Sequence, residues 1–443
     1  MKVVLVKPTI GRKGHSLYTD EGRMEPLMLG VLAALMPDDV EVEILDDRIE
    51  EIPYDIQCDL VGITVETFMA RRAYEIADAF RARGVPVVMG GIHVALIPEE
   101  VQLHCDAIVT GDAESIWHEV LADFKRGKLK KVYKGIPGIG QAGGIKPRRD
   151  LYRDDAYLPV SLMQFSRGCR YSCNFCAVSR YFDKTHYIRR IDEVLEEIAS
   201  QKRRFIFFVD DNIASDKRAL KDLCRELIPL KINWISQASI DVTHDEELMA
   251  LMAKSGCVGN VIGFESITPE SLKDAGKHFN LKNFTRYRHE IDVLRHYAMQ
   301  TWAAFTLGYD SDTYDSIMAT KEFAIKNKFT FAAFNVLTPY PGTPLYDRLR
   351  REGRLLYDGE WWLHPEYRFN HAAFVPRNLT PEALTEACNR ARSDFNSIPA
   401  LLYRFSDFKT NLRTLWRAMS YWRYATLFRR EVFKKNNMQL GLK

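Results

Sequence analysis

The sequence has no run of about 18 apolar residues, the length that a membrane-spanning helix requires. Its net charge is only +3 over 443 residues, which is too small by itself to indicate a nucleic-acid partner. Residues 1–8 open a strand pattern and have neither the apolar length nor the cleavage site of a secretion signal. We therefore expect a cytoplasmic protein without a spanning helix, and no nucleic acid as partner.

Cysteines are few, and they do not indicate disulfides. The chain has eight, and thiols in the cytoplasm are kept reduced. Five of the eight are scattered, mostly in apolar surroundings, and we expect them in the core: Cys58, Cys105, Cys224, Cys257 and Cys388. The remaining three are clustered and need a different explanation.

The clustered cysteines are Cys169, Cys173 and Cys176, in the spacing C-x3-C-x2-C. Three thiolates cannot pair without leaving one over, but they can ligate three corners of a 4Fe–4S cluster, which usually takes four cysteines. The fourth iron is then free to bind another molecule. Three unrelated cysteines in a turn are the alternative. The flanks argue against it, because residues 160–165 form a strand pattern followed by a polar loop, where barrel folds place their chemistry.

This spacing resembles the radical S-adenosylmethionine (SAM) superfamily, and the aromatic Phe175 before the third cysteine fits the same pattern. The resemblance implies that Cys169, Cys173 and Cys176 hold the cluster. It implies that the open iron chelates the amino and carboxylate groups of SAM, whose reductive cleavage gives a 5′-deoxyadenosyl radical. It also implies an external electron donor of the flavodoxin or ferredoxin type.

The first 140 residues alternate short strands with helices. Helix patterns cover residues 26–36, 70–83 and 113–125, and strand patterns cover residues 3–6, 40–45, 60–64, 86–89 and 107–109. This alternation predicts an α/β domain over residues 1–140, Rossmann-like (flavodoxin-like), with a parallel sheet covered on both faces. Ligands of such sheets bind at the carboxyl ends of the strands, where Gly90, Gly91 and Gly111 stand. Ordinary loop glycines are the alternative.

The runs Gly90-Gly91-Ile92-His93 and Gly111-Asp112-Ala113-Glu114 resemble the cobalamin-binding domain that precedes the radical SAM domain in one large subfamily. The resemblance implies that six residues line the corrin ring and its nucleotide tail: Thr64, Glu66, Thr67, Gly90, Gly91 and Gly111. Many cobalamin proteins ligate cobalt through the histidine of D-x-H-x-x-G, but the corresponding loop, residues 46–51, has none, and His93 is not assigned as the ligand. Either cobalamin binds without that ligand, or the domain has lost cobalamin and remains as a scaffold.

Residues 155–350 alternate again, with longer helices. Six strand patterns cover residues 162–165, 205–209, 232–240, 258–264, 302–307 and 331–337, which predicts a partial (β/α)6 barrel. The resemblance to the same subfamily implies that residues at the strand ends approach SAM or substrate, and here these are Asp210, Asp211, Asn212, Gln237, Gly263, Glu265, Ser266 and Pro341. Helix capping is the alternative for residues 210–212, and a structural ion pair is the alternative for Glu265. Lys277 and Tyr340 are weaker candidates.

Residues 351–443 lose the alternation and predict a helical extension, which in this family often lies over the barrel mouth. Thr380 and Pro381 fit the first positions of a helix. From residue 405 the tail is basic and aromatic. Such a helix could lie on an anionic membrane surface, which would suit a lipid substrate, could hold RNA or a peptide, or could simply pack on the barrel.

Together these features predict a cobalamin-dependent radical SAM enzyme that transfers a methyl group to an unactivated carbon of a lipid or another small molecule, such as a secondary metabolite. No catalytic side chain is assigned. Two alternatives stay open: a radical cyclase or rearrangement enzyme whose N-terminal domain is only a scaffold, and a non-catalytic iron–sulfur electron-transfer protein. A tRNA-modifying enzyme would carry a dedicated RNA-binding module, and only the basic tail is present.

Overall fold

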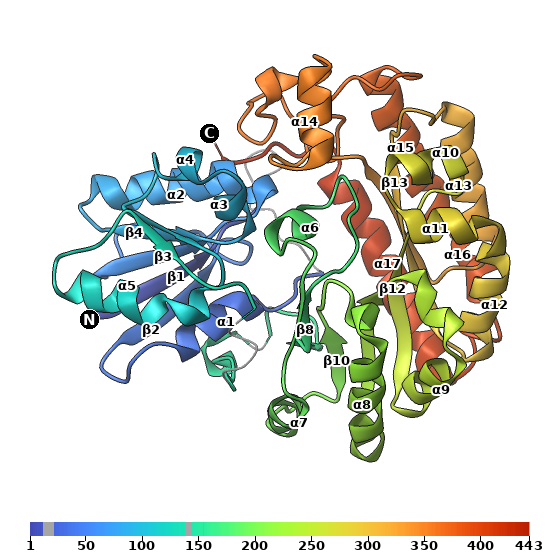
Figure 1. The fold of residues 1–443 in the computed structure, drawn as a ribbon, viewed down its shortest axis with the longest axis horizontal. Helices are drawn as coiled ribbons and strands as arrows, with labels where there is room; N and C mark the ends of the chain where they lie inside the picture. The colour runs from blue at the N-terminus through green and yellow to red at the C-terminus, as the bar shows by residue number, and fades with distance from the viewer. Residues whose placement is uncertain (12–21, 139–143, 154, 443) are drawn as a thin grey trace.

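Two parallel sheets make up the two halves of the molecule (Figure 1). The structure is a computed structural model that describes residues 1–11, 22–138, 144–153 and 155–442. Within these residues each large sheet has six strands. The predicted division at residues 140, 155 and 350 stays a prediction, although the two sheets fall on either side of the first boundary.

The N-terminal sheet has the strand order β2-β1-β3-β4-β5-β6, and all its pairs are parallel. Its first five strands have the flavodoxin-like order, as predicted; β6 was not predicted. The strands are β1 (Lys2–Lys7), β2 (Glu41–Asp46), β3 (Leu60–Thr64), β4 (Val87–Gly90), β5 (Ala107–Thr110) and β6 (Val132–Lys134). The helices are α1 (Leu27–Ala34), α2 (Ala70–Ala82), α3 (Ile92–Leu96), α4 (Pro98–Val101) and α5 (Trp117–Lys125). Residues of β1 alternate between cores on the two faces: Val4 packs on one, Leu5 on the other.

The second sheet confirms the six predicted strands in sequential order from β14 back to β7, all parallel. They are β7 (Ser161–Met163), β10 (Phe205–Phe208), β11 (Asn233–Ala238), β12 (Cys257–Glu265), β13 (Gln300–Leu307) and β14 (Phe331–Val336). The helices beside them are α7 (Ile191–Ala199), α8 (Lys217–Leu227), α9 (Glu246–Lys254), α10 (Pro269–Asp274), α11 (His278–Asn283), α12 (Tyr287–His296) and α13 (Tyr314–Lys326). Burial alternates along β13, so that Ala303 and Phe305 pack against helices while Trp302, Ala304 and Thr306 face the barrel interior.

Helix α8 shows how the sequence builds the outer layer. Its buried residues recur at helical spacing, as Leu220, Leu223, Cys224 and Leu227, so one apolar stripe faces the sheet. The Asp216 carboxylate accepts the backbone N–H of Ala219 at 3.0 Å and so caps the first turn. Cys224 is one of the scattered cysteines, and its buried position confirms the expected core role.

The C-terminal extension is helical, and its long last helix lies away from the barrel mouth. Helix α14 (Pro344–Arg351) precedes the extension, which contains α15 (Pro381–Phe395), α16 (Ile398–Phe405) and α17 (Leu415–Lys435). Phe428 of α17 packs on Trp302 and Phe331, with ring centroids 4.9 and 5.0 Å apart. Both partners lie at the N-terminal ends of their strands, opposite the edge that the sequence predicted for the extension. The expectation of a cover over the mouth is therefore wrong for α17.

Another part of the extension packs on the N-terminal domain. Trp361, Trp362 and Tyr367 are buried in the core formed with β1, β3 and α2. The indole N–H of Trp362 donates to the Glu100 carboxylate at 3.1 Å. Large aromatic side chains contribute much of the apolar area of a core, so the extension joins the two halves.

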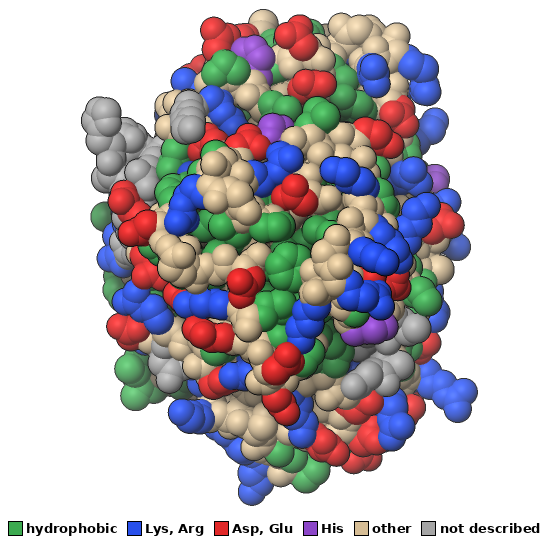
Figure 2. All heavy atoms as spheres, turned by 90° about the vertical axis from the view of Figure 1, so that its left-hand side faces the viewer, with side chains coloured by type: hydrophobic (Ala, Val, Ile, Leu, Met, Phe, Trp, Pro, Cys, Tyr) green, Lys and Arg blue, Asp and Glu red, His purple; other side chains and the backbone are tan. Residues whose placement is uncertain are grey.

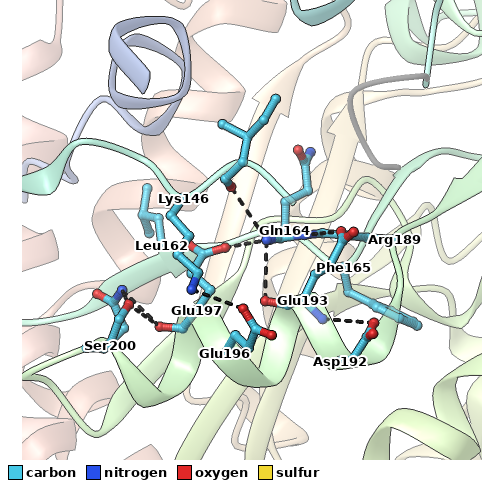
Figure 3. Close-up of polar contacts among 12 residues, drawn as sticks. Lys146, Leu162, Gln164, Phe165, Arg189, Asp192, Glu193, Glu196, Glu197 and Ser200 are labelled. Carbon is cyan, nitrogen blue, oxygen red and sulfur yellow. Dashed lines mark hydrogen bonds and ion pairs between the residues drawn. The ribbon is translucent and has the colours of Figure 1, made fainter. Parts of the chain in front are cut away.

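A buried ion network ties the segment between the halves to α7. The Arg149 guanidinium lies 3.0 Å from the Glu25 carboxylate and 2.8 Å from that of Glu197. Arg189 approaches the other Glu197 oxygen at 2.5 Å, and Figure 3 shows its guanidinium beside this residue. Burial alone would lower the pKa of Arg149, but the Glu197 and Glu25 carboxylates outweigh it and hold that pKa above its ordinary value.

The face of the surface shown in Figure 2 has no stripe of one charge sign. Acidic and basic side chains are interspersed over the N-terminal side of the molecule (Figure 2). Among the described residues, no helix combines the length and apolar character needed to cross a bilayer.

Candidate functional site

The three clustered cysteines lie on a loop that begins where a short β-ribbon ends. The ribbon pairs β8 (Ser166–Gly168) with β9 (His186–Ile188) and was not predicted. Gly168 ends β8 with φ +83°, and a Cβ there would lie 2.3 Å from the carbonyl oxygen of Thr185. Only glycine therefore fits this turn, which delivers Cys169 to the loop. Helix α6 (Ala177–Tyr181) begins directly after Cys176.

The loop is fixed on several sides. The backbone N–H of Asn174 donates to Ala275 O at 3.1 Å, and its own carbonyl accepts the N–H of Leu345 at 3.0 Å. The hydroxyl of Ser179 donates to Tyr171 O at 2.9 Å. These bonds hold the loop between α10, α14 and α6, so that the thiols are positioned before any iron is bound.

The cysteine thiols fit an iron–sulfur cluster by their chemistry. All three are free and half-buried. Burial raises the pKa of Cys173 to about 12 and raises that of Cys176 as well, so both stay protonated until a metal displaces the proton. No three His, Cys, Asp or Glu side chains in the described chain converge closely enough to hold one metal ion. A cube instead binds each thiolate at a different iron.

The residues after β10 divide between three tasks. Asp210 is fully buried and accepts the backbone N–H of Phe165 at 3.2 Å, together with Ser166, so it braces the strand that leads to the cluster loop. Asp211 accepts the N–H of Gly168 at 2.8 Å. Asn212 caps the following turn through Ala214 N–H and lies 3.8 Å from the Cys169 sulfur. Capping was the alternative considered for this run, and Asp210 faces the protein rather than the barrel mouth.

Glu265 ends β12 in a strained conformation with φ +63°, at a break in the strand register. Its carboxylate is nearly buried, lies 2.5 Å from Lys277 Nζ and accepts the Thr306 hydroxyl at 2.8 Å. A Cβ on Gly263 would lie 2.5 Å from Glu265 and 2.6 Å from Lys277. The pair occupies the space that glycine leaves, so the structural ion pair considered from the sequence is formed. A role in holding SAM stays a prediction.

The other barrel residues of the predicted site are spread along the same edge. Gln237 lies on the half-exposed face of β11, two positions after Ile235. Ser266 is buried, and its hydroxyl lies 3.2 Å from that of Thr268. Phe175 packs edge-on against Tyr309 at 6.4 Å. Pro341 is buried in the loop after β14, whose Gly342 faces Leu96 of the N-terminal domain.

A cavity of about 400 Å³ lies between the two halves. Thr64, Glu66, Gly90, Gly91 and Gly111 line it from the carboxyl edge of the N-terminal sheet. The opposite wall comes from the barrel half: Gln164, Arg167, Asp211, Val178, Tyr181 and Phe182. Of the predicted cobalamin residues Thr67 alone is absent from the lining. It is buried, with its hydroxyl 3.2 Å from His93 Nδ1.

The three positions at this edge, Gly90, Gly91 and Gly111, need glycine for different reasons. Gly91 and Gly111 have φ +111° and +76°, and a Cβ on either would approach a backbone oxygen at 2.7 or 2.1 Å. The fold itself requires both. At Gly90 a Cβ would meet nothing closer than 3.7 Å, so its lack of a side chain keeps the cavity open.

Arg167 crosses the cavity between the two halves. Its guanidinium lies 2.8 Å from the Asp112 carboxylate and 2.6 Å from that of Glu114. The Tyr181 hydroxyl donates to the other Asp112 oxygen at 3.2 Å. Burial alone would lower the pKa of Arg167, but Glu114 and Asp112 raise it above its ordinary value. Sequence reasoning missed Arg167 as a cavity residue, although it stands next to the cysteine motif.

None of the described residues that line this cavity is a histidine. His93 is fully buried, lies 3.2 Å from the Tyr74 hydroxyl and 3.3 Å from Glu100, and does not line the cavity. The loop at residues 46–51 is occupied elsewhere, since Asp46 pairs with Arg48 at 2.6 Å and Asp47 with Arg72 at 2.7 Å. Among the described residues, no histidine is therefore placed to ligate cobalt from the wall of this cavity.

Comparisons with known proteins agree with this geometry. The family model of the radical SAM superfamily matches residues 163–324, and that of the B12 binding domain matches residues 17–121. The chain is 31% identical over 405 residues to bacteriochlorophyllide d C-12(1)-methyltransferase of Chlorobaculum tepidum, covering 87% of this chain and 85% of that protein. The chain belongs to the radical SAM superfamily.

Two further relatives support this placement. Bacteriochlorophyllide d C-8(2)-methyltransferase of the same organism is 29% identical over 367 residues, covering 77% of this chain and 80% of the relative. The structure of the radical SAM methyltransferase TsrM from Kitasatospora setae, with cobalamin and a [4Fe–4S] cluster bound, superposes with a TM-score of 0.62 at 20% identity. It covers 79% of this chain and 78% of that one, which shows a common fold.

This radical SAM protein is therefore an enzyme whose cofactors are a 4Fe–4S cluster, SAM and cobalamin. The residues present fit the cluster and cobalamin: three free thiols stand on a fixed loop, and a cavity lies at the carboxyl edge of a B12 binding domain. The reading of this domain as a scaffold that has lost cobalamin, and that of the chain as a mere electron carrier, are both less consistent with this arrangement.

Proposed function

We propose that the enzyme transfers a methyl group from SAM to an unactivated carbon of an apolar small molecule, and that its two cofactor sites act on one shared space. The position of helix α6 is the main support for this proposal. It starts directly after Cys176, and its Val178 and Tyr181 line the cavity of the B12 binding domain. A methyl donor and a hydrogen-abstracting radical must both reach the same carbon, and here one short helix separates their sites.

The chain's own residues hold and enclose this space. The ion pairs of Arg167 with Asp112 and Glu114 join the two halves at the cavity. Cys169, Cys173 and Cys176 would hold the cluster, and Gly90 would face cobalamin. When bound, the cluster and SAM supply a radical that abstracts hydrogen, and cobalamin carries the methyl group. Tyr181 and Phe182 line the cavity and would keep water out of it. A primary radical needs such a dry site, because otherwise side reactions compete.

We also propose two partners. The cluster needs an electron, which a flavodoxin- or ferredoxin-type protein would deliver. The tail provides a peripheral membrane contact: Leu415, Trp416, Met419 and Trp422 of α17 are exposed at 77, 46, 64 and 44%. Basic residues, among them Arg413, Arg423 and Arg430, stand near them in sequence and suit anionic lipid headgroups. The rest of the tail packs on the barrel, where the Tyr421 hydroxyl donates to Leu401 O at 2.9 Å.

The test of methyl transfer uses the anaerobic holoenzyme, titanium(III) citrate and SAM. We expect both 5′-deoxyadenosine and S-adenosylhomocysteine. Gly90→Leu places a side chain in the cavity and should remove S-adenosylhomocysteine while 5′-deoxyadenosine remains. Gly127→Leu, in open space but at a strained φ of +66°, is the control for a destabilised fold with an unchanged cavity. Release of 5′-deoxyadenosine alone by the wild type, with cobalamin bound, would refute methyl transfer and favour a cyclase or rearrangement.

A further inference from the structure

A second cavity lies inside the barrel, at the N-terminal ends of its strands. Its volume is about 470 Å³, within the range of roughly 300–1,000 Å³ usual for small-molecule sites. Aromatic and aliphatic side chains dominate its lining, among them Phe207, Ile235, Val261, Trp302, Phe331 and Trp416. The first five project from barrel strands, and Trp416 comes from α17. We call this cavity the chamber.

Three of the polar residues around the chamber make their bonds with other residues. The side chain of Asn260 accepts the Ser236 hydroxyl at 2.9 Å. Gln300 donates to Asn411 at 3.2 Å, and Thr330 donates to the same residue at 2.6 Å. Ordered water in a cavity needs two to four polar partners. The chamber is therefore suited to hydrocarbon rather than to water.

The chamber lies below the predicted chemical site on the same strand faces. Ile235 lines the chamber, and Gln237 follows two positions later, about 7 Å along the strand. On β12, Val261 is followed on the same face by Gly263. On β13 Trp302 is followed by Ala304 and then by Thr306, which bonds Glu265. The chamber lining ends at Ile235, Val261 and Trp302 on these faces. The next residues on these faces of β12 and β13 are Gly263 and Ala304, which have no side chain or a single methyl group.

The rim of the chamber is formed by one face of α17. Trp416, Met419 and Arg423 line it at positions i, i+3 and i+7, and all three are exposed. Exposed apolar side chains around an apolar cavity mark a binding site rather than a closed core. The chamber therefore opens to the outside beside α17, next to the face that we propose contacts a membrane.

We propose that the chamber binds the apolar part of the substrate, an uncharged hydrocarbon chain or hydrocarbon ring system that enters beside α17. This inference rests on the proposed function, because it takes the barrel edge near Gln237 and Glu265 as the place of reaction. The reacting carbon would lie at that edge and the remaining hydrocarbon in the chamber. Sites of this kind gain affinity by removing apolar area of the ligand from water.

The test measures binding of radiolabelled dodecan-1-ol to the anaerobic holoenzyme by equilibrium dialysis. We expect one saturable site. Val261→Phe fills the chamber and should weaken binding about tenfold or more. Met419→Glu places a charge at the rim, on a side chain that is 64% exposed, and should weaken binding without a folding defect. Leu415→Gln, also on α17 but outside the chamber lining, should bind as the wild type does.

Three outcomes would overturn the proposal: no saturable binding to the wild type, unchanged affinity in both chamber variants, or an equal loss in Leu415→Gln. Iron content and unfolding temperature, measured on each variant, show whether Val261→Phe folds; if it does not, Met419→Glu decides. Release of 5′-deoxyadenosine and S-adenosylhomocysteine by the same wild-type preparation is assayed without added substrate. Failure of that assay refutes the proposed function, whereas failure of dodecan-1-ol binding refutes only the chamber.

Discussion

The interdomain cavity and the barrel chamber are similar in volume, about 400 and 470 Å³, but differ in composition. Charged side chains from both halves line the first, with Arg167 facing Asp112 and Glu114. Aromatic side chains of the barrel half and its tail predominate in the second. The first suits a large cofactor with many polar groups, and the second suits hydrocarbon.

The comparison also concerns how each space is made. The interdomain cavity exists only while two domains stay together, and ion pairs hold them. The chamber is built mainly by the barrel strands and α17, and of its described lining residues Met24 alone comes from the N-terminal half. Disturbing one space should therefore leave the other intact, which makes cobalamin content and dodecan-1-ol binding two separate measurements.

The largest expected effect concerns the loop between the two spaces. Cys169→Ala, Cys173→Ala and Cys176→Ala each remove one cluster ligand, and we expect loss of the iron cluster and of all 5′-deoxyadenosine. Iron analysis and visible absorbance check this. Cys58→Ala is the matched control, because Cys58 is also a free, half-buried cysteine. A full iron count in any of the three loop variants would contradict the ligand assignment.

The next largest effect is expected from removing the ion pairs that join the two halves. Arg167→Met leaves Asp112 and Glu114 unpaired at the cavity, and we expect a loss of about 3 kcal/mol in unfolding free energy together with cobalamin. Dodecan-1-ol binding should persist. In Arg153→Gln the pair lost, with Glu50 at 3.3 Å, is exposed, so the expected change is below about 1 kcal/mol. Equal losses in the two variants would show that Arg167 has no special role.

A smaller effect tests how the edge of the cavity is built. Gly111→Ala combines a left-handed φ of +76° with a Cβ contact of 2.1 Å to Gly135 O, and should cost about 2–4 kcal/mol. Gly84→Ala has a similar φ of +78° and nothing within 4 Å, so only about 1 kcal/mol is expected. Chemical denaturation measures both. Similar values would mean that the backbone near Gly135 yields easily.

The last prediction is a dependence of stability on pH. Burial raises the pKa of Asp210 from 3.8 to about 7, so the folded state binds this proton more tightly than the unfolded state. The stabilisation is complete below pH 3.8 and disappears as pH rises to about 7. Asp210→Asn should remove this component, at most about 1.4 kcal/mol per pH unit. The unfolding free energy of both proteins is measured between pH 4 and 8. An equal change with pH in the wild type and in Asp210→Asn would exclude this contribution.

Much of the fold could be predicted because strands and helices leave local patterns. All six barrel strands and five strands of the N-terminal sheet were predicted, within one or two residues at most ends. The cysteine motif was recognised from its spacing alone, and its role in holding the cluster stays a prediction. The predicted cobalamin residues line the cavity except for Thr67, because carboxyl ends of parallel strands meet at one edge.

What could not be predicted depends on contacts distant in sequence. Asp210 and Asp211 are neighbours in sequence, but one braces Ser166 and the other lines the interdomain cavity. The position of α17 against the N-terminal ends of the strands follows from Trp302 and Phe331, which are over eighty residues away in the chain. A tail rich in aromatic residues indicates packing or exposure, but its sequence does not say which face packs where.

Helix α1 has a position whose consequence concerns the separation of the two cavities. Leu29 and Leu32 line the interdomain cavity, while Leu27 packs with Phe207 in the cluster next to the chamber. A Cβ on Gly30 would lie 2.1 Å from the Tyr152 hydroxyl, so the helix has little room to slide. A helix seated this firmly would stay in place as a wall between the two cavities, so that a molecule bound in one would have no direct passage into the other.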